Sequence, residues 1–208
     1  MFFRTTLSFF FGASCVMAAV ACGDALPDPD RMPDDPSQME PGADKETGDT
    51  PVNPPDPDGT CDNGPLDSPI PNCAPEPPPS TGDPAEDCFR RINQLRWQCQ
   101  CLPPLQRWTA AESCADEHAE YDSTRSPHAG FRDGICENGG FAQNECPGWG
   151  STQSVVQGCL QAMWDEGPGE PFSQHGHYIN MTNPRHSRVA CGFYTTPGGE
   201  VWAVQNFE

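Results

Sequence analysis

The sequence predicts an α+β domain that is held together by disulfide bonds. Helical spacing of apolar residues comes first, within residues 84–166, and two strand-like runs at 189–194 and 200–207 close the chain. Helices followed by neighbouring antiparallel strands are typical of α+β layering rather than of a parallel sheet. The 208-residue chain also has 12 cysteines, which would be a liability in a reducing compartment.

The composition divides the chain into three parts. Of the 25 prolines, 16 lie within residues 23–83, together with 15 of the 30 acidic residues. Such a segment buries too little apolar surface to offset the entropy of ordering it, so we expect a disordered acidic tether at 23–83. The compact domain is expected at 84–208, a usual size for one domain.

Residues 1–22 have the pattern of an export signal. Arg4 precedes an apolar run that ends at Ala21 and is too short for a comfortable membrane span. Two forms of processing are open: plain cleavage after Ala21, or a lipobox in which Cys22 is lipidated. The tether that follows favours the lipid anchor, so we expect a secreted or cell-surface protein, more often anchored through Cys22 than free.

The charge limits the partners. The formal net charge is −19, and no cluster of Lys and Arg is present to bind phosphates. We therefore expect no nucleic acid, membrane contact only through a lipid anchor, and a monomer that binds an unknown lipid or protein ligand. Asp56 to Asp62 faintly resembles a calcium loop, but no bidentate Glu stands at a suitable offset, which disfavours calcium.

Ten cysteines follow Cys22, an even number, as a fully bonded framework requires. No Cys-x-x-Cys pair occurs, so disulfides are favoured over a metal site, and Cys61 is expected to bond Cys73 in a small loop of the tether. The ten predicted disulfide cysteines are Cys61, Cys73, Cys88, Cys99, Cys101, Cys114, Cys136, Cys146, Cys159 and Cys191.

The first two helices have recognisable starts. Asp83 can cap a helix that Pro84 opens, and its apolar positions predict an end near Trp97. Thr109 is expected to cap a second helix that runs to about Asp122. Residues 123–140 contain four glycines and read as a loop.

The later elements follow the same reasoning. Ser151 or Thr152 is expected to cap a third helix that stops near Glu166. The turn at 195–199 predicts a hairpin between the two final strands, and Phe141 marks a further strand at the sheet edge. His177 lies just ahead of the first of these two strands.

Five short motifs occur in an order that resembles the CAP superfamily: cysteine-rich secretory proteins, antigen 5 and pathogenesis-related proteins of class one, which share the SCP domain. The resemblance is to a bacterial secreted or lipid-anchored member, and it implies an α-β-α sandwich with a mostly antiparallel sheet between helices. The motifs are Arg91-Ile92-Asn93-Gln94-Leu95-Arg96, Leu102-Pro103-Pro104-Leu105 with Trp108, Gly176-His177-Tyr178, Arg188-Val189-Ala190-Cys191-Gly192 and Val204-Gln205-Asn206-Phe207.

The resemblance also implies a cleft with two histidines and two acids. His128 and His177 match the histidines and Glu166 matches one acid, whereas Gln143 stands where the family has the other. Glu145 would share a face of an extended segment with Gln143. His128 and His177 are the candidate metal ligands, with zinc as the candidate ion.

Gln143 decides between the functions that this cleft allows. An amide cannot accept a proton near neutral pH, but it can bond a ligand, so we predict a binding module for a small apolar ligand or a partner protein. The first alternative is a zinc-dependent hydrolase that uses His128, His177 and Glu166. The second is a structural surface lipoprotein whose cleft has decayed.

Other catalytic and metal signals are weaker. The sequence has no Gly-x-Ser-x-Gly and no His-Glu-x-x-His. His175 and His177 would share a face of a strand and could form a second metal pair, which we disfavour. His118 and His186 are interpreted as ordinary helix or surface residues.

Overall fold

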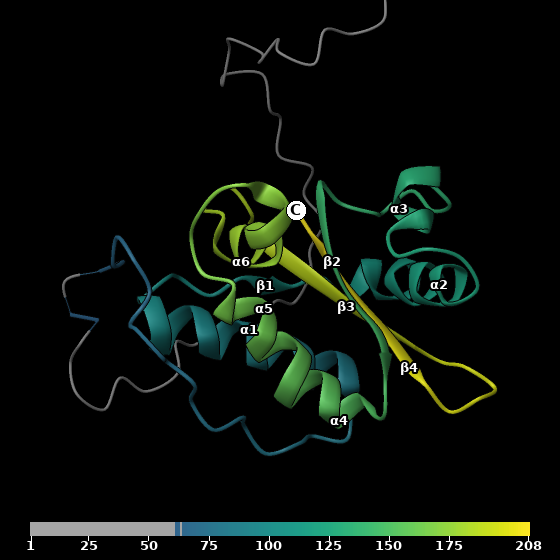
Figure 1. Ribbon diagram of the computed structural model, residues 1–208, viewed down its shortest axis with the longest axis horizontal. Coiled ribbons are helices and arrows are strands. Elements are labelled where there is room, and N and C mark those ends of the chain that lie inside the picture. Colours follow the sequence, from purple (N-terminus) through teal and green to yellow (C-terminus); the bar gives the residue numbers. More distant parts are fainter. Residues whose placement is uncertain (1–60, 63) are drawn as a thin grey trace, which may run out of the picture. The chain divides into compact units, whose positions relative to one another are not determined.

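The computed structural model describes residues 61–62 and 64–208, which form an α+β fold with helices on both faces of one sheet (Figure 1). The sheet contains β1 (Gln106–Arg107), β2 (Ala142–Trp149), β3 (Arg188–Thr195) and β4 (Val201–Phe207) in the order β1-β3-β4-β2. β1 pairs with β3 in parallel, and the other two pairings are antiparallel. The predicted fold class and the final hairpin are both confirmed.

Successive side chains of each strand point to opposite faces of the sheet, so they belong to two separate cores. In β4, Ala203 and Phe207 join the larger core, whereas Val204 packs into the smaller one. The larger core lies under α1 (Pro84–Gln100), η3 (Val155–Cys159), α5 (Leu160–Asp165) and α6 (Phe172–Thr182). The smaller core lies under α2 (Glu112–Ser123). This is the α-β-α sandwich that the resemblance implies.

Gly192 allows α2 to lie close against β3. A Cβ atom at Gly192 would come within 2.2 Å of the backbone carbonyl carbon of Ala115 and the backbone nitrogen of Asp116. The Asp116 carboxylate accepts a hydrogen bond from the Phe193 amide at 2.6 Å. The helix is therefore fixed to the strand by backbone contact rather than by large side chains.

The first two helices differ from the expectations at their ends. Asp83 caps α1 as predicted, by accepting bonds from the amides of Ala85 and Glu86. The helix continues past Trp97 to Gln100 and ends at Cys101, which has φ of 56°. Thr109 does not cap α2; it opens a short 3-10 helix, η2 (Thr109–Ala111), that leads into α2.

The segment expected to be a loop contains a helix, α3 (Ala129–Asp133), which ends at Gly134 in the left-handed conformation. The third predicted helix is one helical run with a π segment in its middle. It comprises α4 (Thr152–Ser154), η3 and α5. Ser151 caps it, as expected, by accepting a bond from the Ser154 amide at 3.0 Å.

The stretch around His177, which precedes β3, is helix α6. Tyr178 and Met181, one turn apart, are the buried side chains of α6, and the Tyr178 ring packs edge-on against Trp164 at 5.2 Å. Neighbours two apart in a helix point to different sides. His175 and His177 therefore do not form the alternative metal pair, and the His175 ring instead contacts the Glu166 carbonyl oxygen at 2.7 Å.

All ten predicted cysteines are paired, but the expected bond between Cys61 and Cys73 is wrong. The amide of Leu66 donates to the Gln100 carbonyl and that of Ile70 to the Cys99 carbonyl, so this segment runs along the end of α1. Each of its cysteines therefore meets a cysteine of the helix end. The pairs are Cys61–Cys101, Cys73–Cys99, Cys88–Cys191, Cys114–Cys136 and Cys146–Cys159.

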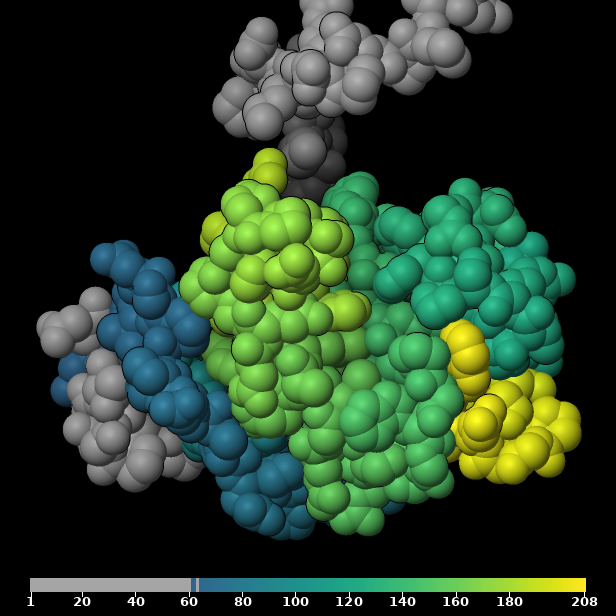
Figure 2. Space-filling view, viewed as in Figure 1, coloured from purple at the N-terminus to yellow at the C-terminus, as the bar shows by residue number. Residues whose placement is uncertain are grey.

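The chain before Pro84 is bound to the helices. Arg91 donates to the Pro75 carbonyl at 2.7 Å, and Gln94 donates to the Glu76 carbonyl at 2.8 Å. Figure 2 shows this blue segment lying against green atoms of the α4–α5 run. The packed part of the chain thus includes residues that composition assigns to the tether.

The export signal, Cys22, the calcium-like loop and the tether up to residue 60 lie outside the described residues. Within the described part of the chain, no helix is long and apolar enough to cross a bilayer.

Candidate functional site

The predicted site residues lie on either side of edge strand β2. Gln143 and Glu145 point from one face of this strand toward His128, which directly precedes α3. Asn144 points from the other face and donates to the His177 carbonyl of α6 at 3.0 Å. Figure 1 shows β2 between α6 and α3, so β2 positions both histidines.

His128 is fixed by both side chains on its face of β2. Its amide donates to Glu145 Oε2 at 2.6 Å, and its Nδ1 lies 2.8 Å from Gln143 Oε1. An amide oxygen only accepts, so Nδ1 carries the hydrogen and Nε2 keeps a free lone pair. His128 has φ of 62°, the left-handed conformation, which turns the chain into α3.

His177 is held in the same manner by a carboxylate. Its Nδ1 lies 2.5 Å from Glu166 Oε1, and its amide donates to Glu166 Oε2 at 3.0 Å. Glu166 directly follows α5, so the bond ties the end of one helix to the next. Histidines that bind metals usually donate the other ring nitrogen to such a carboxylate or carbonyl oxygen.

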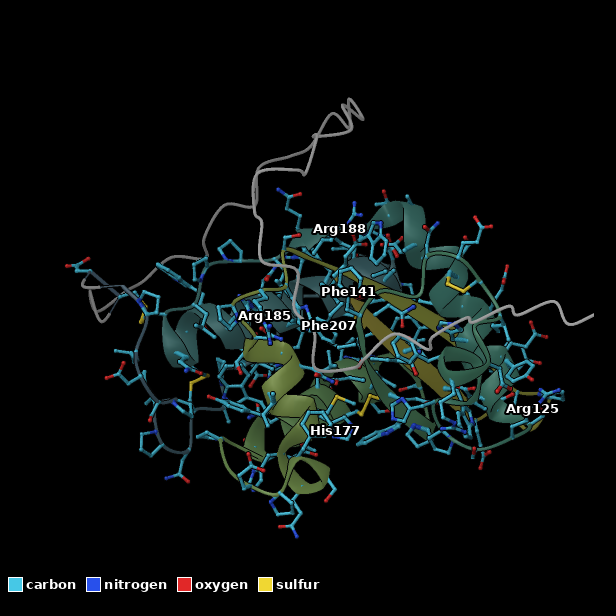
Figure 3. All side chains as sticks on the ribbon, turned by 90° about the horizontal axis from the view of Figure 1, so that it is seen from above. Arg125, Phe141, His177, Arg185, Arg188 and Phe207 are labelled. Carbon is cyan, nitrogen blue, oxygen red and sulfur yellow. A yellow bond between two sulfur atoms is a disulfide. The ribbon has the colours of Figure 1, made fainter. Side chains whose placement is uncertain are left out.

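Two asparagines fix α6 to β2. Asn180 donates to Asn144 Oδ1 at 2.9 Å, and Asn144 is fully buried. Figure 3 shows His177 on α6. The angular position of His177 therefore depends on two side-chain amides, one of them fully buried, from elements far apart in sequence.

Gln143 connects the site to a buried histidine that sequence reasoning missed. Its Nε2 lies 3.0 Å from His118 Nδ1 and donates to Asn206 Oδ1, also at 3.0 Å. His118 is fully buried, and this burial lowers the pKa of its imidazole. His118 lies on a helix, as expected, but it is buried and contacts Gln143; its spacing of four from Cys114 on the buried stripe of α2 is the sequence signal of that burial.

Two acids, Glu145 and Asp122, lie close to the backbone of His128. The carboxyl groups of Glu145 and Asp122 interact electrostatically, and each has a buried oxygen, Glu145 Oε1 and Asp122 Oδ2, without a hydrogen-bond partner. Burial, aided by the charge of Asp122, raises the pKa of Glu145 to about 8. Glu145 is therefore mostly protonated near neutral pH, and its hydrogen can bridge the two acids.

The structure brings the predicted site residues together as two pairs. His128 contacts Gln143, and His177 contacts Glu166. His128, His177 and Glu166, the residues of the hydrolase alternative, do not form a cluster of three ligand atoms. Among the described residues, the only group of three whose ligand atoms all lie within 4.8 Å of one another is Cys114, His118 and Cys136.

One hollow lies between the start of α1 and the α4 region, and neither His128 nor His177 lines it. Its residues are mostly proline and uncharged polar side chains, so it lacks the groups that the predicted chemistry requires. They are Pro77, Pro78, Ser80, Pro84, Asp87, Thr152, Gln153, Val156 and Gln157.

Comparison with protein families found a match to the CAP family, described as the cysteine-rich secretory protein family, over residues 89–207. The matched residues include His128, Gln143, Glu166 and His177. A comparison with curated proteins found no match.

Proposed function

Because the chain belongs to the cysteine-rich secretory protein (CAP) family, we propose that it is an extracytoplasmic binding module that does not catalyse a reaction. Family membership and the five disulfides indicate an extracellular protein. Lipidation at Cys22 and the tether are parts of this proposal, because an anchored domain needs a spacer.

One observation carries the proposal: the groups that could activate a water molecule are already engaged. Glu166 holds both the ring and the amide of His177. Gln143 is an amide, and Glu145 is a buried acid that is mostly protonated near neutral pH. Since a general base must reach the proton it removes, these contacts favour binding over hydrolysis.

The exposed groups of the site suit a ligand with an apolar part. His128 and His177 each keep an Nε2 lone pair. Phe141 is 79% exposed and stands two residues before Gln143, and Phe172 is 56% exposed and opens the helix that carries His177. Aromatic side chains of this kind are enriched where proteins bind partners, so the proposed ligand is an apolar molecule or the apolar surface of a protein.

Each imidazole could bind zinc through its Nε2 atom, because Gln143 or Glu166 engages its Nδ1 atom. His128 and His177 would hold the ion, which would supply a Lewis acid for binding an oxygen or nitrogen of the ligand. Glu166 and Gln143 would orient the two rings.

Metal analysis and ligand capture test this proposal. The purified exported chain should retain an apolar ligand, or bind one, in native mass spectrometry, and His177→Ala should weaken both zinc uptake and ligand binding. His186→Ala is the matched control, because the His186 ring stacks on Phe207 away from the His177–Glu166 pair. Turnover of peptides or cell-wall material that depends on His177 would instead support the hydrolase.

A further inference from the structure

Cys114, His118 and Cys136 form a cluster that the proposed function does not use. Cys114 and His118 stand one turn apart on α2, and Cys136 lies between α3 and β2. Their ligand atoms all lie within 4.8 Å of one another, while Cys114 and Cys136 are joined by a disulfide. Two sulfurs and an imidazole are ligands that zinc prefers in proteins.

The imidazole of His118 is held toward the disulfide. Its Nε2 lies 3.3 Å from Cys136 Sγ, and its Nδ1 is contacted by the amides of Gln143 and Asn206 at 3.0 and 3.3 Å. The backbone of α3 closes over the ring, since a Cβ at Gly130 would lie 2.9 Å from His118 Cδ2. The His118 ring therefore already faces the place where a metal bound by the two sulfurs would lie.

The cluster is close to the geometry of a tetrahedral zinc site. With Zn–S near 2.3 Å and Zn–N near 2.0–2.1 Å, such a site places its ligand atoms about 3.5–3.8 Å apart. The distance from His118 Nε2 to Cys136 Sγ already approaches that value. Only the two sulfurs must separate, from a bond of about 2.0 Å to about 3.8 Å.

The chain around Cys136 permits this separation. Cys114 is buried on a helix, whereas Cys136 is half-buried in an irregular segment that begins after Gly134 and ends at Gly140. Both of these glycines have positive φ, at 61° and 75°. The sulfur of Cys136 is thus the one that a small reductant reaches and the one that can move.

We propose that Cys114, Cys136 and His118 form a zinc site that is closed by the disulfide and opened by a dithiol reductant. The dithiol is oxidised to its own disulfide, and the protein disulfide is reduced to two thiols. One Zn²⁺ then displaces the two thiol protons, the imidazole hydrogen shifts from Nε2 to Nδ1, and Nε2 binds the metal. The side-chain amides of Gln143 and Asn206 both turn, so that the Gln143 oxygen accepts the new Nδ1–H and the Asn206 nitrogen donates to that same oxygen, and water completes the coordination.

The test uses the full exported chain and Co²⁺ as a spectroscopic probe for Zn²⁺. Mild dithiothreitol should open Cys114–Cys136 first, as shown by alkylation and mass spectrometry. The reduced chain should keep its circular dichroism and bind one Co²⁺ with thiolate charge-transfer absorption, and Zn²⁺ should displace the Co²⁺. The oxidised chain should show no such absorption.

Three variants separate this site from other thiols. The double variant Cys114→Ser with Cys136→Ser should lose the absorption, whereas the control Cys73→Ser with Cys99→Ser should keep it. His118→Gln should weaken Co²⁺ binding by at least about tenfold, because loss of even an outer-shell partner commonly has that effect. Preferential opening of another disulfide, unfolding on mild reduction, or a thiolate–Co²⁺ absorption that persists in the Cys114/Cys136 variant overturns the proposal.

Discussion

At the scale of single residues, Gln143 is the centre of the site. Its oxygen faces His128, and its nitrogen faces both His118 and Asn206. Only a side chain with one acceptor end and one donor end satisfies all three contacts. The amide that replaces the family acid is therefore matched to the buried groups behind it, and it still orients the histidine in front.

Replacing Gln143 with Glu should destabilise the fold near neutral pH. A carboxylate would place an acceptor against His118 Nδ1 and Asn206 Oδ1, and leaving buried groups unpaired costs about 1–3 kcal/mol. The loss should shrink at lower pH, where the added acid or His118 takes up a proton. Urea unfolding at several pH values measures this loss.

Gln157→Glu is the control, because Gln157 is exposed in the η3 segment. It should change the free energy of unfolding by much less. Equal losses for the two variants would show that added negative charge, rather than the contacts of Gln143, sets the effect.

Glu145 should make stability depend on pH. Its pKa is raised in the folded chain, from the ordinary 4.5 to about 8, by burial and by Asp122. The stabilisation that it contributes is complete below pH 4.5 and is lost as pH rises through 8, because the unfolded chain releases this proton earlier. Glu145→Gln should therefore gain stability relative to the wild type as pH increases through this window.

Thermal or urea unfolding across this pH range gives that difference. Glu120 is an exposed acid on α2, so the difference in stability between Glu120→Gln and the wild type should not grow with pH. A difference between wild type and Glu145→Gln that stays constant with pH would contradict the raised pKa.

At the scale of elements, the contact of α2 with β3 and the contact of α6 with β2 place the site. α2 brings His118 beneath Gln143. α6 presents His177 because Asn144 of the strand binds its backbone. Helices α2 and α6 pack on opposite faces of the sheet, and they position His118 and His177, respectively.

Gly192→Ala should separate α2 from β3. The new Cβ would lie 2.2 Å from backbone atoms of α2, and overpacking of this kind typically costs about 1–3 kcal/mol. Gly198→Ala in the β3–β4 turn is the matched control, because its nearest neighbouring atom would lie at 3.6 Å. Denaturant unfolding should show a lower free energy of unfolding for Gly192→Ala but not for Gly198→Ala. Equal decreases for the two variants would argue against the close contact of α2 with β3.

At the scale of the whole molecule, disulfides join elements that are distant in sequence. Cys88–Cys191 links α1 to β3 over 103 residues, and closing a loop of about that length stabilises a chain by about 4.7 kcal/mol in the chain-entropy model. Cys61–Cys101 and Cys73–Cys99 fasten the chain before α1 to the end of that helix. The fold thus extends into the proline-rich part of the chain.

Single serine variants test this connectivity. Cys73→Ser should free the thiol of Cys99, and Cys61→Ser should free that of Cys101. Alkylation of the chain after unfolding without reductant, because these thiols are buried in the fold, followed by peptide sequencing identifies the freed cysteine. Cys88→Ser, which should free Cys191, is the control, and recovery of alkylated Cys61 from the Cys73→Ser chain would contradict the structure.

The sequence by itself determined the elements whose signals are local. The cap at Asp83, the cap at Ser151 and the hairpin turn at 195–199 depend on neighbouring residues, so they could be read directly. The shared face of Gln143 and Glu145 follows from the two-residue period of a strand. The order of the family motifs then gave the sandwich and the residues of the two histidine pairs.

Only the tertiary structure decided the features that depend on distant partners. Helix α6 has a histidine-rich sequence with an internal glycine, and its contacts with Asn144 and Trp164 support the helix. The partner of Cys73 depends on how the preceding chain runs along α1, which no spacing reveals. Helical spacing places His118 on the buried stripe of α2, but only the tertiary structure shows that the side-chain amide of Gln143 on β2 meets it.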